Sequence, residues 1–290
     1  MDTQRESFRR YKFVTSRLGH SPAGLEGMDL TQFMHGTPAP VMMCRNCGTL
    51  RRCDDEPANY EADRYDPALL RHLYPRYLRA FQRKRTHYEP LLPPRAEVLE
   101  IGSHIGAFLE AAENWGWKPI GLDIGADTSE FARRQGGTVK RIALTDYRPR
   151  LRQPDAVFIW NCFEQLEDPR QSLEDARRLV AHHGLVVLRV PNGDFYRERT
   201  ADRRGWLRAL GYNNLLGFPY LHGYGLDSLE RLLRSANFEP TASFSTSLLV
   251  PPYPEMSPPL SEEWRKLETD AEHASARRSP WIEVVGRAFA

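Results

Sequence analysis

The chain has few cysteines, almost no net charge and no long apolar run, and each shortage argues against a class of protein. No stretch of about 18 apolar residues occurs, so no membrane-spanning helix is expected. Four cysteines among 290 residues do not make a disulfide framework, which favours a reducing, cytoplasmic location. The first residues are polar with mixed charges, unlike a secretory signal. A net charge of +2 is too balanced to indicate nucleic acid as a partner.

Apolar residues are present in sufficient number for a packed core, at 41% of the chain. The length suits one large or two smaller domains. Residues 1–40 show little periodicity, whereas strand and helix patterns alternate after residue 67. We therefore expect an N-terminal module over residues 1–66 and an α/β domain over residues 67–290. The expected assembly is a monomer or a homodimer.

The stretch from Val98 to Leu109 is the centre of this second domain. An apolar run typical of a buried strand is followed by a turn containing Gly102 and Gly106, and then by a helical pattern. This geometry lets a backbone approach a ligand closely and turns a helix N-terminus toward it. A second strand ends in Asp123, near the spacing at which an acid meets a ribose hydroxyl in nucleotide-binding units. A turn without a ligand is the alternative.

The turn, Glu100-Ile-Gly-Ser-His104-Ile-Gly106, resembles the E/D-x-G-x-G-x-G motif of class I S-adenosylmethionine (SAM) methyltransferases. His104 stands where that family has its middle glycine. The resemblance implies a Rossmann-like seven-stranded methyltransferase sheet with helices on both faces. The SAM-binding residues that it implies are Glu100, Gly102, Ser103, Gly106, Asp123, Ile124, Asp146 and Asn161. A turn or helix-cap role for Asp146 has equal weight.

The later motifs follow the order of the same family. Residues 161–169 resemble its Leu-Glu-His-x-x-Asp-Pro loop, with Gln165 in place of histidine, and Pro191-Asn192 closes the next strand. Pro75 is expected to break or restart a helix over residues 68–88. Helix caps are expected at Asp127, Asp168 and Asp227. The remaining strands are expected over residues 138–143, 155–160, 185–190, 242–250 and 281–287.

Residues 193–225 form a long segment rich in aromatic and arginine side chains, which we interpret as a lid over the substrate. A methyl acceptor with an oxygen or carbon nucleophile must lose a proton, and histidine suits that step near neutral pH. The candidate bases are His222 in the lid, then His104, then Glu164. Each of these is alternatively a structural residue. A catalytic metal is not expected, because Gln165 replaces the histidine that binds metal in some relatives.

Cys44-Arg-Asn-Cys47-Gly has the spacing of a zinc knuckle, whose turn points two thiolates at one ion. Cys53, His35 and His20 are the nearby residues that can complete four ligands. The segment resembles part of the N-terminal zinc module of sugar C-methyltransferases, although the first Cys-x-x-Cys of that module is absent. The resemblance implies a structural zinc ion held by Cys44, Cys47, Cys53 and His35. The alternative is a vestigial knuckle with free thiols.

Taken together, the sequence predicts an enzyme that transfers a methyl group from SAM to an oxygen or carbon of a small molecule, such as a sugar or a secondary metabolite. Two other functions stay open. One is a catalytically silent partner protein with the methyltransferase fold, since function resides in sites rather than folds. The other is an NAD-linked oxidoreductase, against which His104 argues because it replaces a glycine of the motif.

Overall fold

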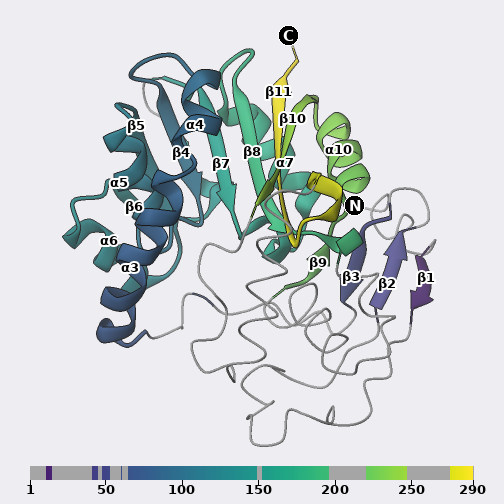
Figure 1. Ribbon diagram of the computed structural model, residues 1–290, viewed down its shortest axis with the longest axis horizontal. Helices are drawn as coiled ribbons and strands as arrows, with labels where there is room; N and C mark the ends of the chain where they lie inside the picture. Colours follow the sequence, from purple (N-terminus) through teal and green to yellow (C-terminus); the bar gives the residue numbers. More distant parts are fainter. Residues whose placement is uncertain are drawn as a thin grey trace, which may run out of the picture.

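The structure is a computed structural model whose larger part is an open α/β sheet (Figure 1). It describes residues 11–14, 41–44, 48–52, 60, 65–148, 152–195, 220–246 and 275–289. Predictions for Cys47, Cys53 and His35, and for most of the lid, lie outside these residues. In the part of the chain described, no helix combines the length and the apolar character needed to cross a bilayer.

The large sheet has seven strands, as the sequence predicts. They are β4 (Glu97–Ile101), β5 (Lys118–Asp123), β6 (Val139–Arg141), β7 (Ala156–Trp160), β8 (Leu185–Pro191), β10 (Phe238–Thr246) and β11 (Trp281–Ala288). Their spatial order is β10-β11-β8-β7-β4-β5-β6. The five strands from β8 to β6 run parallel, and β11 runs antiparallel to both of its neighbours, β8 and β10. The chain order reverses between β4 and β7, and ligands of open α/β sheets bind at such a reversal.

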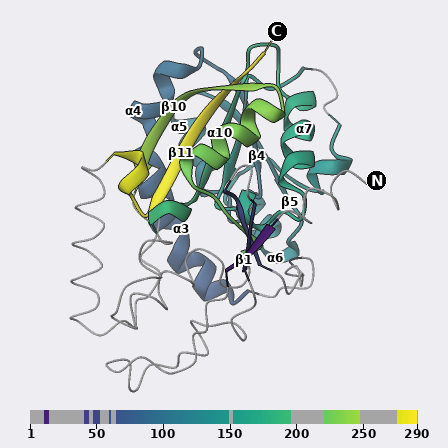
Figure 2. The same ribbon diagram turned by 90° about the vertical axis from the view of Figure 1, so that its right-hand side faces the viewer.

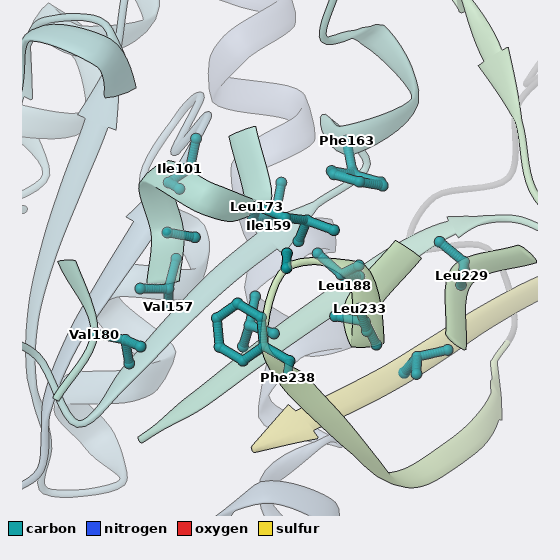
Figure 3. Close-up of a cluster of buried hydrophobic side chains, with 14 of the residues drawn as sticks. Ile101, Val157, Ile159, Phe163, Leu173, Val180, Leu188, Leu229, Leu233 and Phe238 are labelled. Carbon is teal, nitrogen blue, oxygen red and sulfur yellow. The ribbon is translucent and has the colours of Figure 1, made fainter. Parts of the chain in front are cut away.

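Helices cover both faces of this sheet, as expected. They are α3 (Pro67–Gln82), α4 (Arg85–Tyr88), α5 (Ala107–Asn114), α6 (Ala126–Arg134), α7 (Pro169–Leu179) and α10 (Leu226–Ser235). The turned view shows α4 and α7 on opposite sides of the sheet (Figure 2). Neighbouring residues of β7 point to opposite cores: Phe158 packs with α4 and α5, and Ile159 with Leu173 of α7 and Leu233 of α10 (Figure 3). The strand is therefore apolar throughout, because it is buried on both faces.

A second, four-stranded sheet joins the N-terminal part of the chain to the segment before α10. Its order is β1 (Tyr11–Val14), β2 (Val41–Cys44), β3 (Leu50–Arg52) and β9 (His222–Gly223). The β3 and β9 strands are antiparallel, with Leu50 opposite Gly223 and Arg51 opposite His222. Two residues of the expected lid thus belong to a sheet with the N-terminal strands. The division of the chain at residue 66 stays a prediction.

The expected break at Pro75 is wrong, because α3 continues through it from Pro67 to Gln82. Proline removes a helical hydrogen bond to the carbonyl of Arg71. Both Pro75 and Arg71 are exposed, so water can hydrogen-bond to that carbonyl. The helix begins as capping rules predict, with the Asp66 carboxylate accepting from the Ala68 N–H at 2.8 Å.

Two expected helix caps are also wrong. The N-cap residues of α6 and α10 are Gly125 and Gly225, so Asp127 and Asp227 lie inside the first turn. There Asp127 accepts the Tyr65 N–H at 3.0 Å, and Asp227 pairs with Arg277. An acid in the first turn still stabilises a helix through its dipole.

The third expected cap is confirmed. Asp168 accepts the Gln171 N–H at 2.9 Å, directly before Pro169 at the start of α7. The strand expected over residues 242–250 begins earlier than predicted, because β10 already starts at Phe238.

Candidate functional site

A cavity of about 550 Å³ opens at the carboxyl ends of β4, β5 and β7, where the chain order reverses. Its wall contains Gly102 after β4, Asp123 at the end of β5, and Asn161 after β7. Of the residues that the sequence assigns to the cofactor, Glu100, Ser103 and Ile124 also line it. The topology therefore brings most of the expected cofactor site together.

The two glycines of the turn serve different purposes. Gly102 has φ of 71°, and a Cβ there would lie 2.7 Å from Sγ of Cys162, so glycine lets the turn approach the loop after β7. Gly106 has φ of 74°, and its Cβ would lie 2.8 Å from the Cβ of Ala132 in α6. Gly106 is outside the cavity wall among the residues described, and it permits close packing of α5 and α6.

His104 adopts the backbone conformation that the family motif gives to glycine, with φ of 46°. This left-handed region is uncommon for other residues, although histidine is enriched in it. Its ring lines the cavity and meets Tyr65 edge-on, with ring centroids 5.7 Å apart. Burial lowers the pKa of His104, and the Asp123 carboxylate opposes that shift. The imidazole is therefore neutral near pH 7 and able to accept a proton.

The Asp123 carboxylate accepts three hydrogen bonds from the protein. They come from the N–H of His104 at 2.6 Å, the N–H of Gly125 at 2.8 Å and the hydroxyl of Thr128 at 2.9 Å. A carboxylate offers about four acceptor positions. Asp123 thus holds the glycine turn against the end of β5 and keeps room for about one further donor.

Glu100 is a buried acid with an unsatisfied oxygen. Its residue is 3% exposed, and its Oε2 atom has no hydrogen-bond partner among the residues described. Burial raises the pKa of Glu100 well above its usual value, and the nearby Asp123 carboxylate adds to the shift. A cationic or hydrogen-bond-donating ligand in the cavity would satisfy this oxygen and lower the cost of burying it.

Besides Gly106, three residues that the sequence assigns to the site are not on the described cavity wall. Asp146 lies exposed on the short helix η2 (Leu144–Asp146), whose residue Leu144 does line the cavity. Glu164 is fully buried in η3 (Phe163–Gln165), and burial raises its pKa to about 8. His222 is 1% exposed on β9, with its ring stacked 6.0 Å from that of Tyr224.

The cavity wall is more aromatic than expected, since the sequence places aromatic side chains over the substrate only from the lid, residues 193–225. The aromatic side chains of the wall are Tyr60, Tyr65, Tyr77, Phe81, Phe108, Trp160 and Tyr220. The sequence could have predicted that Trp160 lines the cavity, because Trp160 ends β7, next to the point where the strand order reverses. The tyrosines preceding the catalytic strands carry no local signal that they fold back over the cavity. Among the described lining residues, the charged groups are the acids Glu100, Asp123 and Glu167, together with the titratable His104.

Of the four expected zinc ligands, the structure describes Cys44 alone. Cys44 is buried at the end of β2, and its carbonyl accepts the N–H of Gly48 at 2.8 Å. Gly48 has φ of 79°, in the left-handed region that favours glycine. The described residues contain no group of three or more His, Cys, Asp or Glu side chains placed to hold a metal ion.

Comparison with known proteins agrees with this geometry. A family model described as a methyltransferase domain matches residues 61–243. A SAM-dependent methyltransferase from Archaeoglobus fulgidus is 17% identical, with a TM-score of 0.51 over 77% of this chain and 100% of its own. One from Thermotoga maritima is 15% identical, with a TM-score of 0.51 over 76% of this chain and 94% of its own. No curated protein matches. The family match and the shared fold show that the chain belongs to the class I methyltransferase family, whose members are enzymes.

Proposed function

We propose that the chain transfers a methyl group from SAM to an oxygen or carbon atom of a small molecule. The observation that carries the proposal is the buried Glu100 carboxylate, with an unpartnered oxygen, in a cavity beside the glycine turn and Asp123. The acid and the turn suit a ligand with a ribose and a cationic amino-acid part. A pyrophosphate suits them less, because it prefers a helix N-terminus free of carboxylates.

The residues that would hold the cofactor are Glu100, Gly102, Ser103, Asp123 and Asn161, which line the cavity. SAM supplies a sulfonium methyl group; the carbon–sulfur bond breaks as the acceptor bonds the methyl carbon, and its electron pair stays on sulfur. Asp123 would accept one ribose hydroxyl directly, and a second one if a protein donor moves away. The aromatic wall would exclude water and orient the acceptor.

The base that takes the acceptor proton is, in this proposal, His104. Of the three candidate bases, His104 lies on the described cavity wall, whereas His222 and Glu164 do not. The lowered pKa of His104 keeps the imidazole neutral. His222, the first candidate from the sequence, becomes the second, because it lies on β9 two residues from the lining residue Tyr220. Glu164 is the third, since its raised pKa leaves it largely protonated at pH 7.

The cavity suits a methyl acceptor that is a neutral or cationic small molecule with an apolar or ring-shaped part. The described wall is rich in aromatic side chains, and it contains acidic side chains but no lysine or arginine. Rings bind apolar and cationic groups through their faces. A sugar ring or a secondary metabolite meets these requirements, and neither nucleic acid nor a membrane surface is required as a partner.

The N-terminal knuckle is proposed to hold a structural zinc ion through Cys44, Cys47, Cys53 and His35. The support is the Cys-x-x-Cys-Gly spacing and the hydrogen bond from the N–H of Gly48 to the carbonyl of Cys44. The four side chains together give a closed ligand set of the kind that zinc prefers in structural sites.

Titration with SAM tests the main proposal. The wild-type chain should bind SAM and S-adenosylhomocysteine, and should bind NAD(H) at least tenfold more weakly. Glu100→Gln keeps the shape of the side chain but cannot ionise when a cationic ligand binds. It should weaken SAM binding by about tenfold or more, since a charge-assisted hydrogen bond contributes about 1.5–3 kcal/mol. A wild-type chain that binds no SAM would contradict the proposal.

A further inference from the structure

Asn161 stands directly after β7, and protein contacts fix most of its hydrogen-bonding groups. Its backbone N–H donates to the carbonyl of Arg189 at 3.0 Å. Its backbone carbonyl accepts from Nε2 of Gln165 at 2.6 Å. Its φ of 51° lies in the left-handed region, where asparagine is tolerated better than most residues. The position and direction of this residue are therefore closely determined.

Arg189 determines which way the side-chain amide of Asn161 faces. Its guanidinium Nη1 donates to Oδ1 of Asn161, and a guanidinium can only donate. The amide oxygen must therefore face Arg189, which leaves the NH₂ group of Asn161 for another partner. Among the residues described, no acceptor contacts this NH₂ group, and Asn161 lines the cavity.

Both residues that hold Asn161 are themselves held. Arg189 is fully buried; its Nε lies 3.3 Å from the Glu283 carboxylate, and its guanidinium lies 4.3 Å above the Trp281 ring. The Tyr60 hydroxyl donates to Oε1 of Gln165. Burial raises the pKa of Tyr60, so this hydroxyl stays a donor. Because Oε1 accepts from Tyr60, Nε2 of Gln165 faces the Asn161 carbonyl.

We propose that Arg189 and Gln165 are positioning residues that present the NH₂ group of Asn161 to the cavity as a hydrogen-bond donor. The ligand atom that it meets is an oxygen: a carboxylate oxygen of the cofactor's amino-acid part, or a hydroxyl or carbonyl oxygen of the methyl acceptor. Gln165, where relatives have histidine, thereby supplies a donor and an acceptor at once. The inference rests on the proposed binding of SAM in this cavity.

The first test is Asn161→Asp in the full chain. The variant keeps an acceptor for Arg189 and replaces the NH₂ donor by a carboxylate oxygen. S-adenosylhomocysteine and 5′-methylthioadenosine, which lacks the amino-acid part, are titrated into the wild type and the variant. If the donor meets the cofactor, the variant binds S-adenosylhomocysteine at least tenfold more weakly than the wild type does. It binds 5′-methylthioadenosine as tightly as the wild type does.

If the donor meets the acceptor, both titrations stay unchanged, and transfer of labelled methyl groups from SAM to a small-molecule cell extract falls at least tenfold. Unchanged binding of both probes together with unchanged transfer overturns the inference. The thermal midpoint separates this role from a merely structural one. It should stay equal or rise, because aspartate makes a charge-assisted bond to Arg189.

The second test is Gln165→Met, which keeps the length of the side chain but removes both hydrogen bonds. Whichever quantity Asn161→Asp lowers, binding of S-adenosylhomocysteine or methyl transfer, Gln165→Met should lower by a smaller factor of about two- to tenfold. Gln153→Met is the matched control, because Nε2 of Gln153 donates to a backbone carbonyl, that of Arg178, on the surface. Equal behaviour of Gln165→Met and Gln153→Met overturns the positioning role. A wild type that binds neither probe instead defeats the proposed function.

Discussion

At the scale of single residues, His104 combines a strained backbone with a side chain in the cavity. His104→Gln should lower methyl transfer by roughly 10²-fold or more, because general-base catalysis contributes about 10²–10⁴. SAM affinity should change little, since the backbone N–H of residue 104 still binds Asp123. Turnover by the wild type and by His104→Gln, measured with labelled SAM, checks this. His222→Ala serves as the comparison, and a larger loss there would assign the base to His222.

The pH dependence of methyl transfer should also depend on the protonation of His104. Burial depresses the pKa of His104, so the neutral form persists until pH falls below about 6.5, the usual histidine value. Transfer should therefore stay constant from pH 8 to about 6.5 and decline at lower pH, with the declining limb absent in His104→Gln. Stability follows the same sign: the unfolded histidine binds its proton more readily, so this contribution decreases as pH falls through about 6.5. A rate that declines above pH 7 in the wild type would contradict the assignment.

Residue identities from the sequence were most informative where backbone geometry fixes the side chain. Glu100, Gly102 and Asp123 lie at or beside the carboxyl ends of β4 and β5, which end at one edge of the sheet, so their order along the chain predicts that they meet. Asp146 belongs to a loop whose exposure depends on packing that no local pattern encodes. The wall tyrosines that precede the large sheet were missed for the same reason: Tyr60 donates to Gln165, 105 residues further along the chain.

At the scale of elements, Gly106 controls how α5 packs on α6. Gly106→Ala would place a methyl group 2.8 Å from the Cβ of Ala132 at φ of 74°. It should lower the free energy of unfolding by about 2–4 kcal/mol, combining overpacking with left-handed backbone strain. Gly136→Ala is the control, because φ there is 97° and no atom lies within 4 Å of the added carbon. Denaturant unfolding of both variants checks this, and equal losses would remove the packing argument.

Secondary structure was predictable to the extent that it depends on apolar periodicity. The buried strands β7 and β8 and the last strand β11 have the expected positions within a residue or two. Starts of helices were less predictable, because glycine or aspartate can cap a helix. At α6, the N-cap residue is Gly125, and the Asp123 carboxylate accepts its N–H and the hydroxyl of Thr128.

At the scale of the whole molecule, a buried ionic cluster joins the short helix α4 and the residue before it to β10 and β11. Lys84 pairs with Glu283 and donates to Thr246 at 2.9 Å, and Tyr88 donates to the other oxygen of Glu283. Lys84→Met should destabilise the fold by about 3–5 kcal/mol, since removal of one partner leaves a buried charge less compensated. Arg85→Met, which breaks an exposed pair with Glu89, should cost less than about 1 kcal/mol. Thermal unfolding compares the two, and equal effects would show that the cluster contributes no more than a surface pair.

Metal content is also a property of the whole molecule. Protein purified without chelator should contain about one zinc ion per chain, and Cys44→Ser should lower that content. Elemental analysis measures the metal, and thiol titration before and after chelation counts the cysteines that it protects. Absence of zinc, with every thiol freely reactive, would leave the knuckle as a turn without metal.

The pairing of β3 with β9 also determines the order in which the chain can assemble. Arg51 and His222 are neighbours in the sheet but far apart in the sequence, so this contact closes a very long loop at a high cost in chain entropy. During synthesis, β3 must wait with an unpaired edge until residue 222 has emerged, and such edges pair readily with other chains. We therefore expect the N-terminal strands to join the fold late, so that their correct attachment marks the end of folding rather than its beginning.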